Sequence, residues 1–553
     1  MMKIFLSTYL LLFFYSCLFS QNTVGVINYD PTKTYDGYSL LFPVMDTNTY
    51  LLDNCGRVVH EWNNKNVPGQ MALLLEDGNL LRTYIDGQNN NAIISNGGAS
   101  DGVQLMDWNG TVLWDYVVSD SVHRMHHDVA YMPNGHVLIH AWELKTKTDA
   151  ALVGYDTTKF PSSNKLLSEG IYEVEPIGSN GGNIVWEWHV WDHLIQDNDT
   201  SISTTYGLVS KHPELIDVNY NVFDDDFMHV NSIDYNADLD QIMISIHNYG
   251  EVWIIDHSTT ITEAASHIGG KCGKGGDLLY RWGNPQTYDQ GSPTDQIFWG
   301  QHNAQWIAKG LKDEGKILVF NNGWDRPGEK YSSVEIFVPP LDTLTGNYIY
   351  SSGTAFGPPA SEWVYTANPK TAFYSDHISG AQRLENGNTL ICYSTKGMVF
   401  EITPNDSVVW SYVNPLNGSI AIAQGQMPTA NQNAMFRCYK YGTNYAGLSG
   451  KILSPGNYIE LNPDTSICAV SAGINETIEV ENNITIFPNP ITNSFHVSST
   501  QKIKSIRITD TFGKILYQSL VYDFYCEINL FAFKTGIYFL QINETFNTII
   551  EKQ

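Results

Sequence analysis

Apolar and polar positions alternate in short runs separated by turns rich in Asn, Asp and Gly, a pattern typical of β-hairpins. The clearest example begins at Gly300-Gln301-His302 and continues through Ile317-Leu318-Val319-Phe320 to Asn321-Asn322. It predicts a hairpin with a histidine at the start of its first strand and two amides at the end of its second. Because these two ends of a hairpin lie side by side, we expect His302 to lie close to Asn321 and Asn322.

Two hairpin patterns recur along the chain. The first is a strand, a tight turn and a strand that ends in Trp, and it occurs at residues 51–62, 105–114 and 400–410. The second has an Asp-Gly or Asn-Gly turn and occurs at residues 70–79, 127–136 and 379–388. Residues 229–234 and 302–307 fit the second pattern with longer turns. Asn, Asp and Gly supply the positive φ that such turns require.

The repeats predict a ring of six units. Their corresponding points are Gln70, His127, His229, His302, Ser379 and Arg437. The mean spacing, (437 − 70)/5 or about 73 residues, exceeds a compact propeller blade, so we interpret residues 144–164 and 269–298 as insertions. An open array of hairpins is the alternative, but a hairpin with one apolar face needs neighbours on both sides. We therefore expect an all-β, six-bladed β-propeller over residues 21–461.

The ends of the chain have a different character. A lysine and an apolar run at residues 1–20 predict a secretory signal peptide that is cleaved after Ser20, with acylation of Cys17 as the lesser alternative. Residues 462–483 are polar and predict a linker. Residues 484–553 alternate again and predict a small β-sandwich. No other segment is long and apolar enough for an integral membrane span.

Composition narrows the function. The net charge of −27 leaves no basic stripe for nucleic acid. No Gly-x-x-x-x-Gly-Lys loop and no Gly-x-Ser-x-Gly elbow occurs, which argues against a nucleotide cofactor and a serine hydrolase. Six cysteines remain without Cys17, and they allow fifteen disulfide pairings. The sequence leaves both a monomer and a homodimer open.

Hairpin geometry predicts one polar site. It places His127 near His140, His229 near His247, and Ser379 near Thr395, and His377 faces the same side as Ser379 because it lies two positions away. If the first strand of each hairpin is the inner strand of a blade, these side chains surround one mouth of the channel. Each histidine alone could be structural. A Zn or Cu centre is a rival interpretation. Asp224–Asp226 and residues 236–240 are candidates for structural calcium, although solvated turns suit them better.

Several motifs together resemble the bacterial arylsulfate sulfotransferase family. They are Met228-His229-Val230-Asn231, Tyr280-Arg281-Trp282-Gly283-Asn284-Pro285, Gln301-His302-Asn303-Ala304-Gln305-Trp306, Phe320-Asn321-Asn322-Gly323 and Tyr331-Ser332-Ser333-Val334-Glu335. The resemblance covers most of residues 30–460. It implies a six-bladed propeller that works outside the cytoplasm without a nucleotide sulfate donor, and that moves a sulfuryl group between phenols through a sulfated histidine.

The resemblance also implies roles for residues. His302 and His229 match the family's active-site histidines, and Asn321 and Asn322 are candidate donors to the sulfuryl oxygens. The nucleophile stays open among His302, His229 and His377, since the family's usual nucleophile has no match at residues 395–399. Ser333 stands where the family has an arginine, and Arg281, Arg326, Arg124 or Arg437 could replace that cation. His127, His247 and Asn231 complete the predicted substrate site.

The C-terminal segment has a resemblance of its own. Phe487-Pro488-Asn489-Pro490 and Thr535-Gly536-Ile537-Tyr538 look like the sorting domain of the Bacteroidetes type IX secretion system. We therefore expect a secreted or surface enzyme that takes a phenolic sulfate donor and a phenolic acceptor and needs no cofactor. The alternative is a non-catalytic surface propeller that binds a glycan or a protein.

Overall fold

The computed structural model describes residues 22–86, 94, 96–221, 224–468, 484–510, 514–543 and 546–553. Two compact units are present: the first ends at Asp464 and the second runs from Thr465 to Gln553. The predicted signal peptide, Cys17 included, and residues 469–483 of the predicted linker lie outside the described residues. The predicted domain boundaries therefore remain predictions.

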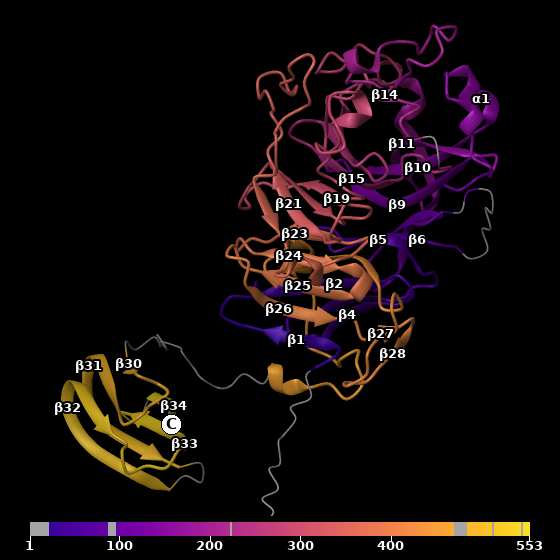
Figure 1. Ribbon diagram of the computed structural model, residues 1–553. Helices are drawn as coiled ribbons and strands as arrows, with labels where there is room; N and C mark the ends of the chain where they lie inside the picture. Colours follow the sequence, from indigo (N-terminus) through magenta and orange to yellow (C-terminus); the bar gives the residue numbers. More distant parts are fainter. Residues whose placement is uncertain are drawn as a thin grey trace, which may run out of the picture. The chain divides into compact units, whose positions relative to one another are not determined.

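Six antiparallel sheets make up most of the first unit, each with four strands except for one that gains β1 as a fifth (Figure 1). The first three sheets are formed by β29 (Met435–Gly442), β2 (Gly37–Pro43), β3 (Thr49–Leu52) and β4 (Val58–Trp62); by β5 (Pro68–Leu74), β6 (Leu80–Tyr84), β7 (Gly102–Met106) and β8 (Val112–Val117); and by β9 (His123–Tyr131), β10 (Val137–Lys145), β11 (Leu166–Ile177) and β12 (Gly181–His189). The other three are formed by β15 (Val230–Asn236), β16 (Gln241–Ile246), β17 (Glu251–Asp256) and β18 (Tyr280–Trp282); by β19 (His302–Trp306), β20 (Ile317–Asn321), β21 (Ser333–Phe337) and β22 (Trp363–Tyr365); and by β23 (Gly380–Arg383), β24 (Thr389–Tyr393), β25 (Met398–Ile402), β26 (Val408–Val413) and β1 (Gly25–Tyr29).

Smaller elements lie between these strands. They are α1 (Lys147–Leu152), α2 (Ile261–Ala264), the parallel pair β13 (Leu194–Ile195) and β14 (Ile216–Asp217), and the antiparallel pair β27 (Leu416–Asn417) and β28 (Ile420–Ala421). The segment 269–298 contains β18, so the interpretation of that whole segment as an insertion is wrong. A strand of three residues is too short to show the alternation on which the prediction depends.

The first strands of the six sheets contact one another in a closed cycle. β5 contacts β9, β9 contacts β15, β15 contacts β19, β19 contacts β23, β23 contacts β29, and β29 contacts β5. β29 comes from the end of the unit but pairs with β2 near its start, from Gly37↔Gly442 to Pro43↔Met435. An open array would leave its first and last sheets apart. The arrangement is therefore consistent with a propeller.

The tryptophan that ends the first hairpin pattern joins one sheet to the next. The indole N–H of Trp62 donates to the carbonyl of Asp107 (3.2 Å) in the turn of the following sheet. Four further buried indoles make the same kind of bond: Trp114 to Gly181, Trp188 to Gly276, Trp282 to Pro358 and Trp410 to Asn54. Because a buried indole needs an acceptor, these contacts fix how neighbouring sheets pack.

The core lies between the sheets. Every residue of β16 and β17 is buried, since both faces of these strands are covered. One cluster joins Leu138, Ile171 and Trp188 of the third sheet to Ile244 and Trp253 of the fourth. Each such side chain contributes roughly 1.5–3 kcal/mol by leaving water. The packed sheets therefore fix the positions of the first strands relative to one another.

The second unit is a small β-sheet of five strands: β30 (Ile484–Phe487), β31 (Ser494–Thr509), β32 (Ile515–Asn529), β33 (Gly536–Ile542) and β34 (Phe546–Lys552). The long β31 pairs with β30 along its first half and with β33 along its second, while β32 runs beside it. The sheet is thus curled around a core that includes Phe495, Ile506 and Leu540. The prediction of a small β-sandwich is confirmed only as far as a small β domain, because its strands belong to one curled sheet.

The structure also shows which cysteines are oxidised and whether a helix could span a membrane. Cys55 and Cys468 each take part in a disulfide, whereas Cys272, Cys392, Cys438 and Cys526 are free thiols. Within the described ranges, no helix has the length and apolar character needed to cross a bilayer.

Candidate active site

Five of the six first strands carry a backbone irregularity at the same end. Non-glycine residues there adopt a positive φ: Gln70 (104°), His127 (52°), His229 (53°), Asn303 (54°) and Ser379 (88°). Such a conformation costs about 1–3 kcal/mol per residue and is concentrated at functional sites. A bulge of this kind also re-aims the neighbouring side chains. The strained positions coincide with, or directly follow, the corresponding points of the sequence repeats.

Four histidines meet at these irregularities, and we call them the histidine cluster: His127, His229, His247 and His302. Their rings form an edge-to-face chain, with centroids 4.8 Å apart for His127 and His229, 5.3 Å for His229 and His247, and 5.5 Å for His247 and His302. The predicted convergence of these side chains is therefore observed. In all four histidines the hydrogen-bonded nitrogen is Nδ1, and Nε2 makes no hydrogen bond to a described residue. None of these Nε2 atoms is completely buried.

His302 is held in one tautomer. Its Nδ1 lies 2.9 Å from Oδ1 of Asn322 and 3.1 Å from the carbonyl of Gly300. Both partners are acceptors, because the Asn322 amide nitrogen donates to the carbonyls of Ser375 (2.8 Å) and Ile378 (2.7 Å). The hydrogen of the neutral ring therefore sits on Nδ1, and Nε2 presents a lone pair. Burial is the main cause that holds the pKa of His302 well below its usual value.

His229 has the opposite electrostatic character. Its Nδ1 donates to Oδ2 of Asp226 at 2.6 Å, and the indole of Trp142 donates to the other oxygen at 3.0 Å. Burial alone would lower the pKa of His229, but the charge and hydrogen bond of Asp226 outweigh it and raise the pKa. Asp226 thus favours the protonated form of His229, whereas burial favours the neutral form of His302.

His247 is neutral as well. Its Nδ1 donates to Oδ1 of Asn248 at 2.6 Å, and burial followed by the charge of His229 lowers its pKa to about 4. Beside it lies a pocket of about 320 Å³, whose lining includes Trp324, Trp299, Tyr220 and Asp224. The Trp324 ring lies 5.5 Å from that of His247 and is 50% exposed. An aromatic ligand could stack there while its polar end reaches the histidine cluster.

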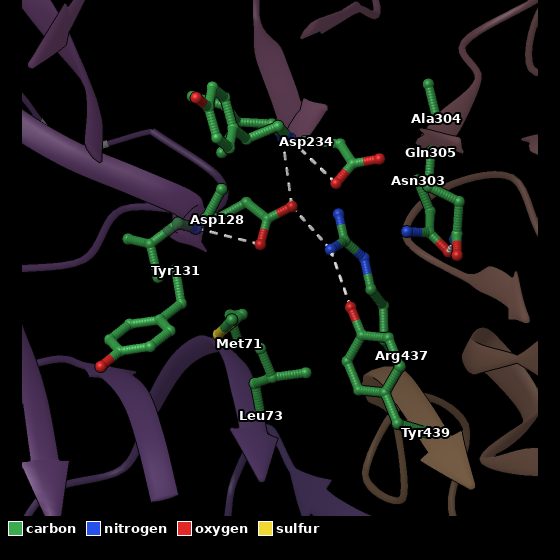
Figure 2. A pocket seen from close by; sticks show the side chains of 14 residues that line it. Met71, Leu73, Asp128, Tyr131, Asp234, Asn303, Ala304, Gln305, Arg437 and Tyr439 are labelled. Carbon is green, nitrogen blue, oxygen red and sulfur yellow. Dashed lines mark hydrogen bonds and ion pairs between the residues drawn. The ribbon is translucent and has the colours of Figure 1, made fainter. Parts of the chain in front are cut away.

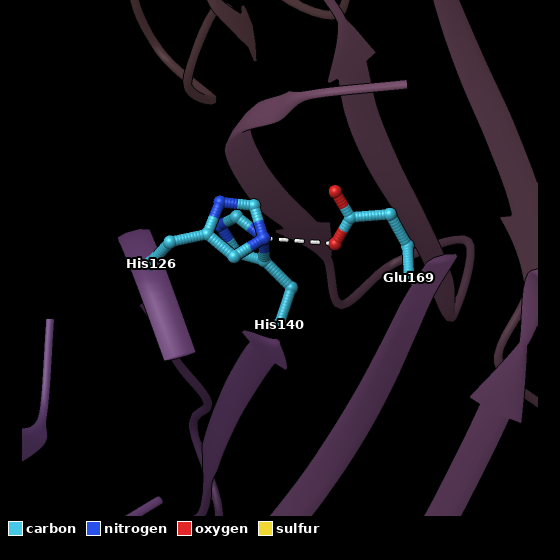
Figure 3. A group of neighbouring side chains, drawn as sticks. All are labelled: His126, His140 and Glu169. Atoms are coloured by element: carbon cyan, nitrogen blue, oxygen red, sulfur yellow. Dashed lines mark hydrogen bonds and ion pairs between the residues drawn. The ribbon is translucent and has the colours of Figure 1, made fainter. Parts of the chain in front are cut away.

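Two residues absent from the sequence prediction, His126 and Glu169, support the cluster from behind together with His140, which hairpin geometry placed near His127. Nε2 of His126 hydrogen-bonds to Glu169 at 2.8 Å, and its Nδ1 hydrogen-bonds to Nδ1 of His127 at 2.9 Å. The His126 ring also stacks on Trp142. His140 lies edge-on to His126, at 4.4 Å between centroids (Figure 3). The sequence signal was the His126-His127 pair itself. Glu169, on β11, gave no local signal.

Other predicted residues lie elsewhere. His377 is about half exposed and bonds to Asp376 at 2.7 Å. Its effect on the cluster is electrostatic, through His247. The Asn321 amide donates to Ile297 and Glu335, so its hydrogens are engaged away from His302. Asn231 donates to the carbonyl of Gln301. The positions of these three residues do not support the prediction that they contact substrate.

Arg281 is a structural residue by its contacts. It lies on the outermost strand β18, fully buried, where Nη2 meets Glu251 at 2.6 Å and Thr287 at 2.8 Å. Its guanidinium also packs over Trp253 and Tyr288. The sequence suggested a substrate cation because an arginine stood within a family motif, whereas the fold places it on the strand farthest from the first strand of its sheet.

Farther along the same first strands lies a second polar group, the arginine network: Arg437, Asp128, Tyr439 and the carbonyl of Asn231. Arg437 donates to Asp128 (2.6 Å), Asn231 O (3.1 Å) and Tyr439 (3.3 Å), as Figure 2 shows for Asp128 and Tyr439. These side chains and Asp234 line a cavity of about 190 Å³. Burial raises the pKa of Asp234 to about 6.

Two groups of side chains could hold a metal ion by composition: His126, His140 and Glu169, and His193, His267 and Asp277. The carboxylates considered for calcium have other partners. Asp226 bonds to His229, and Asp240 bonds to His257 at 2.7 Å. The histidine cluster offers neutral imidazole nitrogens beside an imidazole whose protonated form a carboxylate stabilises.

Comparison with known proteins decides the family. The arylsulfotransferase (ASST) family model matches residues 23–415, most of the chain. The protein belongs to the arylsulfotransferase family. The secretion system C-terminal sorting domain matches residues 485–553 of this arylsulfotransferase-family chain. The sorting domain implies an interaction with the type IX secretion machinery and export to the cell surface or beyond.

Other comparisons add little to the family assignment. No curated protein matches the chain. Among solved structures, a protein of unknown function from Bacteroides caccae is similar with 12% identity and a TM-score of 0.37, over 68% of this chain and 93% of that one. The periplasmic gluconolactonase of Pseudomonas aeruginosa has 10% identity and a TM-score of 0.33, over 68% and 96%. At these TM-scores the likeness supports no conclusion about the arylsulfotransferase-family protein.

Proposed function

We propose that this protein is a secreted, nucleotide-independent arylsulfotransferase that transfers a sulfuryl group from a phenolic sulfate to a phenolic acceptor through His302. Family membership supports the activity. The observation that carries the assignment of the nucleophile is the pinned tautomer of His302, whose Nδ1 faces two acceptors while Nε2 stays free. We also propose that the six sheets form a six-bladed propeller, with the histidine cluster at one mouth of its channel.

The reaction takes two steps with balanced bonds. In the first, the Nε2 lone pair of His302 forms an N–S bond as the S–O bond to the aryl group breaks, and the phenol leaves after taking up a proton. In the second, an acceptor phenol attacks the sulfur, loses its proton and restores His302. Asn322 stabilises the positive ring by accepting from Nδ1. A neutral imidazole suits this role because protonation would remove the attacking lone pair.

His229 supplies the positive charge of the site. Its proximity to the cluster and its ion pair with Asp226 suit it to face the sulfuryl oxygens, whose charge the transition state redistributes. It would replace the family arginine whose position Ser333 occupies. Arg281 does not suit that role, because it lies on the outermost strand of its sheet, and the Nη atoms of Arg437 already donate to Asp128, Tyr439 and Asn231. The aryl group would occupy the pocket beside Trp324.

A chromogenic assay tests the proposal. The purified protein should release 4-nitrophenol from 4-nitrophenyl sulfate faster when a phenol acceptor is added, and the sulfated acceptor should form. His302→Ala should abolish both, whereas His136→Ala, a histidine that bonds to Glu173 outside the cluster, should not. Binding of the aryl sulfate with no turnover would favour the alternative, a surface propeller that binds a glycan or a protein.

A further inference from the structure

Behind the histidine cluster, three side chains form a continuous line of hydrogen bonds into the protein. Oε2 of Glu169 lies 2.8 Å from Nε2 of His126, and Nδ1 of His126 lies 2.9 Å from Nδ1 of His127. Figure 3 shows the first of these bonds. Glu169 and His126 are almost completely buried, and His127 is 3% exposed. The line therefore runs from an enclosed carboxyl group to a ring of the histidine cluster.

Only two proton arrangements satisfy both bonds when the two rings are neutral. If Glu169 is ionised, Nε2 of His126 carries a hydrogen, Nδ1 of His127 carries another, and Nε2 of His127 is an acceptor. If Glu169 is protonated, every hydrogen shifts by one position, and Nε2 of His127 becomes a donor. The two arrangements differ by one proton on the whole line. His127 can therefore give or take a proton without a ring rotation.

The surroundings keep the line intact. The His126 ring is stacked on Trp142 at 3.9 Å with an interplanar angle of 3°. Gly98 packs directly on His127, because a Cβ added at Gly98 would lie 1.9 Å from Cε1 of that ring. The second oxygen of Glu169 accepts from the backbone N–H of Val230 at 3.1 Å. Burial raises the pKa of Glu169 well above its usual value and lowers those of His126 and His127, which favours the arrangement with the proton on the carboxyl group.

We propose that Glu169, His126 and His127 form a proton relay that protonates the departing phenolate oxygen and later accepts the proton of the acceptor phenol. The inference rests on the proposed sulfuryl transfer. His127 is the group that faces the substrate, and His126 and Glu169 act through it as positioning residues. Neither the family match nor any motif in the sequence assigns this line a role.

The relay balances over a full turnover. As the S–O bond breaks, Nε2–H of His127 passes its proton to the phenolate, Nδ1–H of His126 passes one to His127, and Glu169 passes one to His126. The sulfated enzyme thus holds an ionised Glu169. When the acceptor phenol attacks the sulfur, its proton enters at Nε2 of His127, the shifts reverse, and Glu169 is protonated again. No proton is gained or lost.

A metal centre on the same residues is the competing interpretation, and hydrogen bonding opposes it. Nε2 of His140 accepts from the backbone N–H of Asp128 at 3.3 Å, so the hydrogen of the neutral ring resides on Nδ1. Nδ1 is buried without a partner among the described residues. A nitrogen that carries a hydrogen cannot bind a metal. The remaining pair, His126 and Glu169, is already joined by a hydrogen bond of ordinary length.

The test compares donors whose phenols differ in acidity. A relay matters most for a basic leaving group, so Glu169→Gln should leave the rate with 4-nitrophenyl sulfate within about threefold and lower that with phenyl sulfate by about 100-fold, in the range of general acid catalysis. His127→Gln should produce the same steeper dependence on leaving-group acidity. The matched control is Glu173→Gln, on the same strand and likewise bonded to histidines, which should change neither rate.

Separate outcomes distinguish the relay from the proposed function. A wild-type protein that transfers no sulfuryl group contradicts the proposed function, and the relay with it. An active wild type with equal losses for both donors in Glu169→Gln overturns the relay alone. Nitrogen NMR of ¹⁵N-histidine protein supplies a readout without substrate: Glu169→Gln should change the signals of His126 and His127. One bound equivalent of transition metal, lost in His140→Gln, would also overturn the relay.

Discussion

The histidine cluster and the arginine network occupy successive positions on the same strands, yet they differ in how completely their polar groups are paired. β9 supplies His127 to the cluster and Asp128 to the network. In the network, both Nη atoms of Arg437 have acceptors, and of the guanidinium nitrogens Nε alone lacks a partner among the described residues. In the cluster, the Nδ1 atoms are bonded and the Nε2 atoms are left free. The pairing thus suits the network to a structural role, whereas the free Nε2 atoms fit the proposal that the cluster binds substrate.

The largest expected effect belongs to the cluster. His302→Ala should lower sulfuryl transfer by about a thousandfold or more, on the order of a lost nucleophile, with no loss of fold. Steady-state kinetics with 4-nitrophenyl sulfate and a phenol acceptor measures it. A variant that keeps most of the wild-type rate would remove His302 from the reaction.

The matching change in the network should affect stability. Arg437→Met leaves the buried Asp128 carboxylate unpaired, which costs about 3–5 kcal/mol. All 14 tryptophans lie between residues 62 and 410, so their fluorescence during urea unfolding reports on the first unit. The double variant Asp128→Leu/Arg437→Met should regain most of the loss. Strong inactivation of a well-folded Arg437→Met protein would instead make the network part of the active site.

The ion pair of His229 predicts a pH dependence. A raised pKa keeps His229 protonated below that value, so kcat/KM should fall as the pH rises through it. Asp226→Asn removes the carboxylate charge, lowers the pKa of His229, and moves the falling limb to lower pH, with about a tenfold loss for each unit between the pH and the new pKa. A pH–rate profile measures the limb. An unmoved limb would show that another group controls it.

Two adjacent amides give a smaller and sharper contrast. Asn322→Ala removes the nearer of the two acceptors that fix the His302 tautomer and should lower kcat by about tenfold, the value of one hydrogen bond. Asn321→Ala should leave kcat unchanged, because its amide bonds to Ile297 and Glu335. Equal effects on kcat would contradict the tautomer argument.

The smallest expected effect concerns the aryl pocket. Trp324→Ala should raise KM for the aryl sulfate by about three- to tenfold, as expected for one lost aromatic contact, and leave kcat little changed. Leu344→Ala, at a side chain 95% exposed, is a control for surface truncation. A drop in kcat with unchanged KM would instead show that Trp324 acts in the sulfuryl-transfer step and not in binding the aryl group.

Much of this arrangement could be predicted from the sequence, because it depends on local pattern. Alternation and Asn-Gly turns predict the hairpins, and register then places His127, His229 and His302 at equivalent points. What the sequence could not predict depends on contacts between distant segments. Glu169 reaches His126 from another strand, and Asp226 acts on His229 from a loop. Asn321 is the last residue of β20 and Asn322 follows it, so the alternation of side chains along the strand no longer predicts which way each amide points.

The central claim is that His302 carries the sulfuryl group. Its most direct test is mass spectrometry of the protein after reaction with excess 4-nitrophenyl sulfate in the absence of an acceptor, with mapping of the modified peptide. The proposal predicts one sulfuryl group on His302 that disappears when phenol is added and never forms in His302→Ala. Turnover without an adduct, or an adduct on His229 or His377, would contradict it.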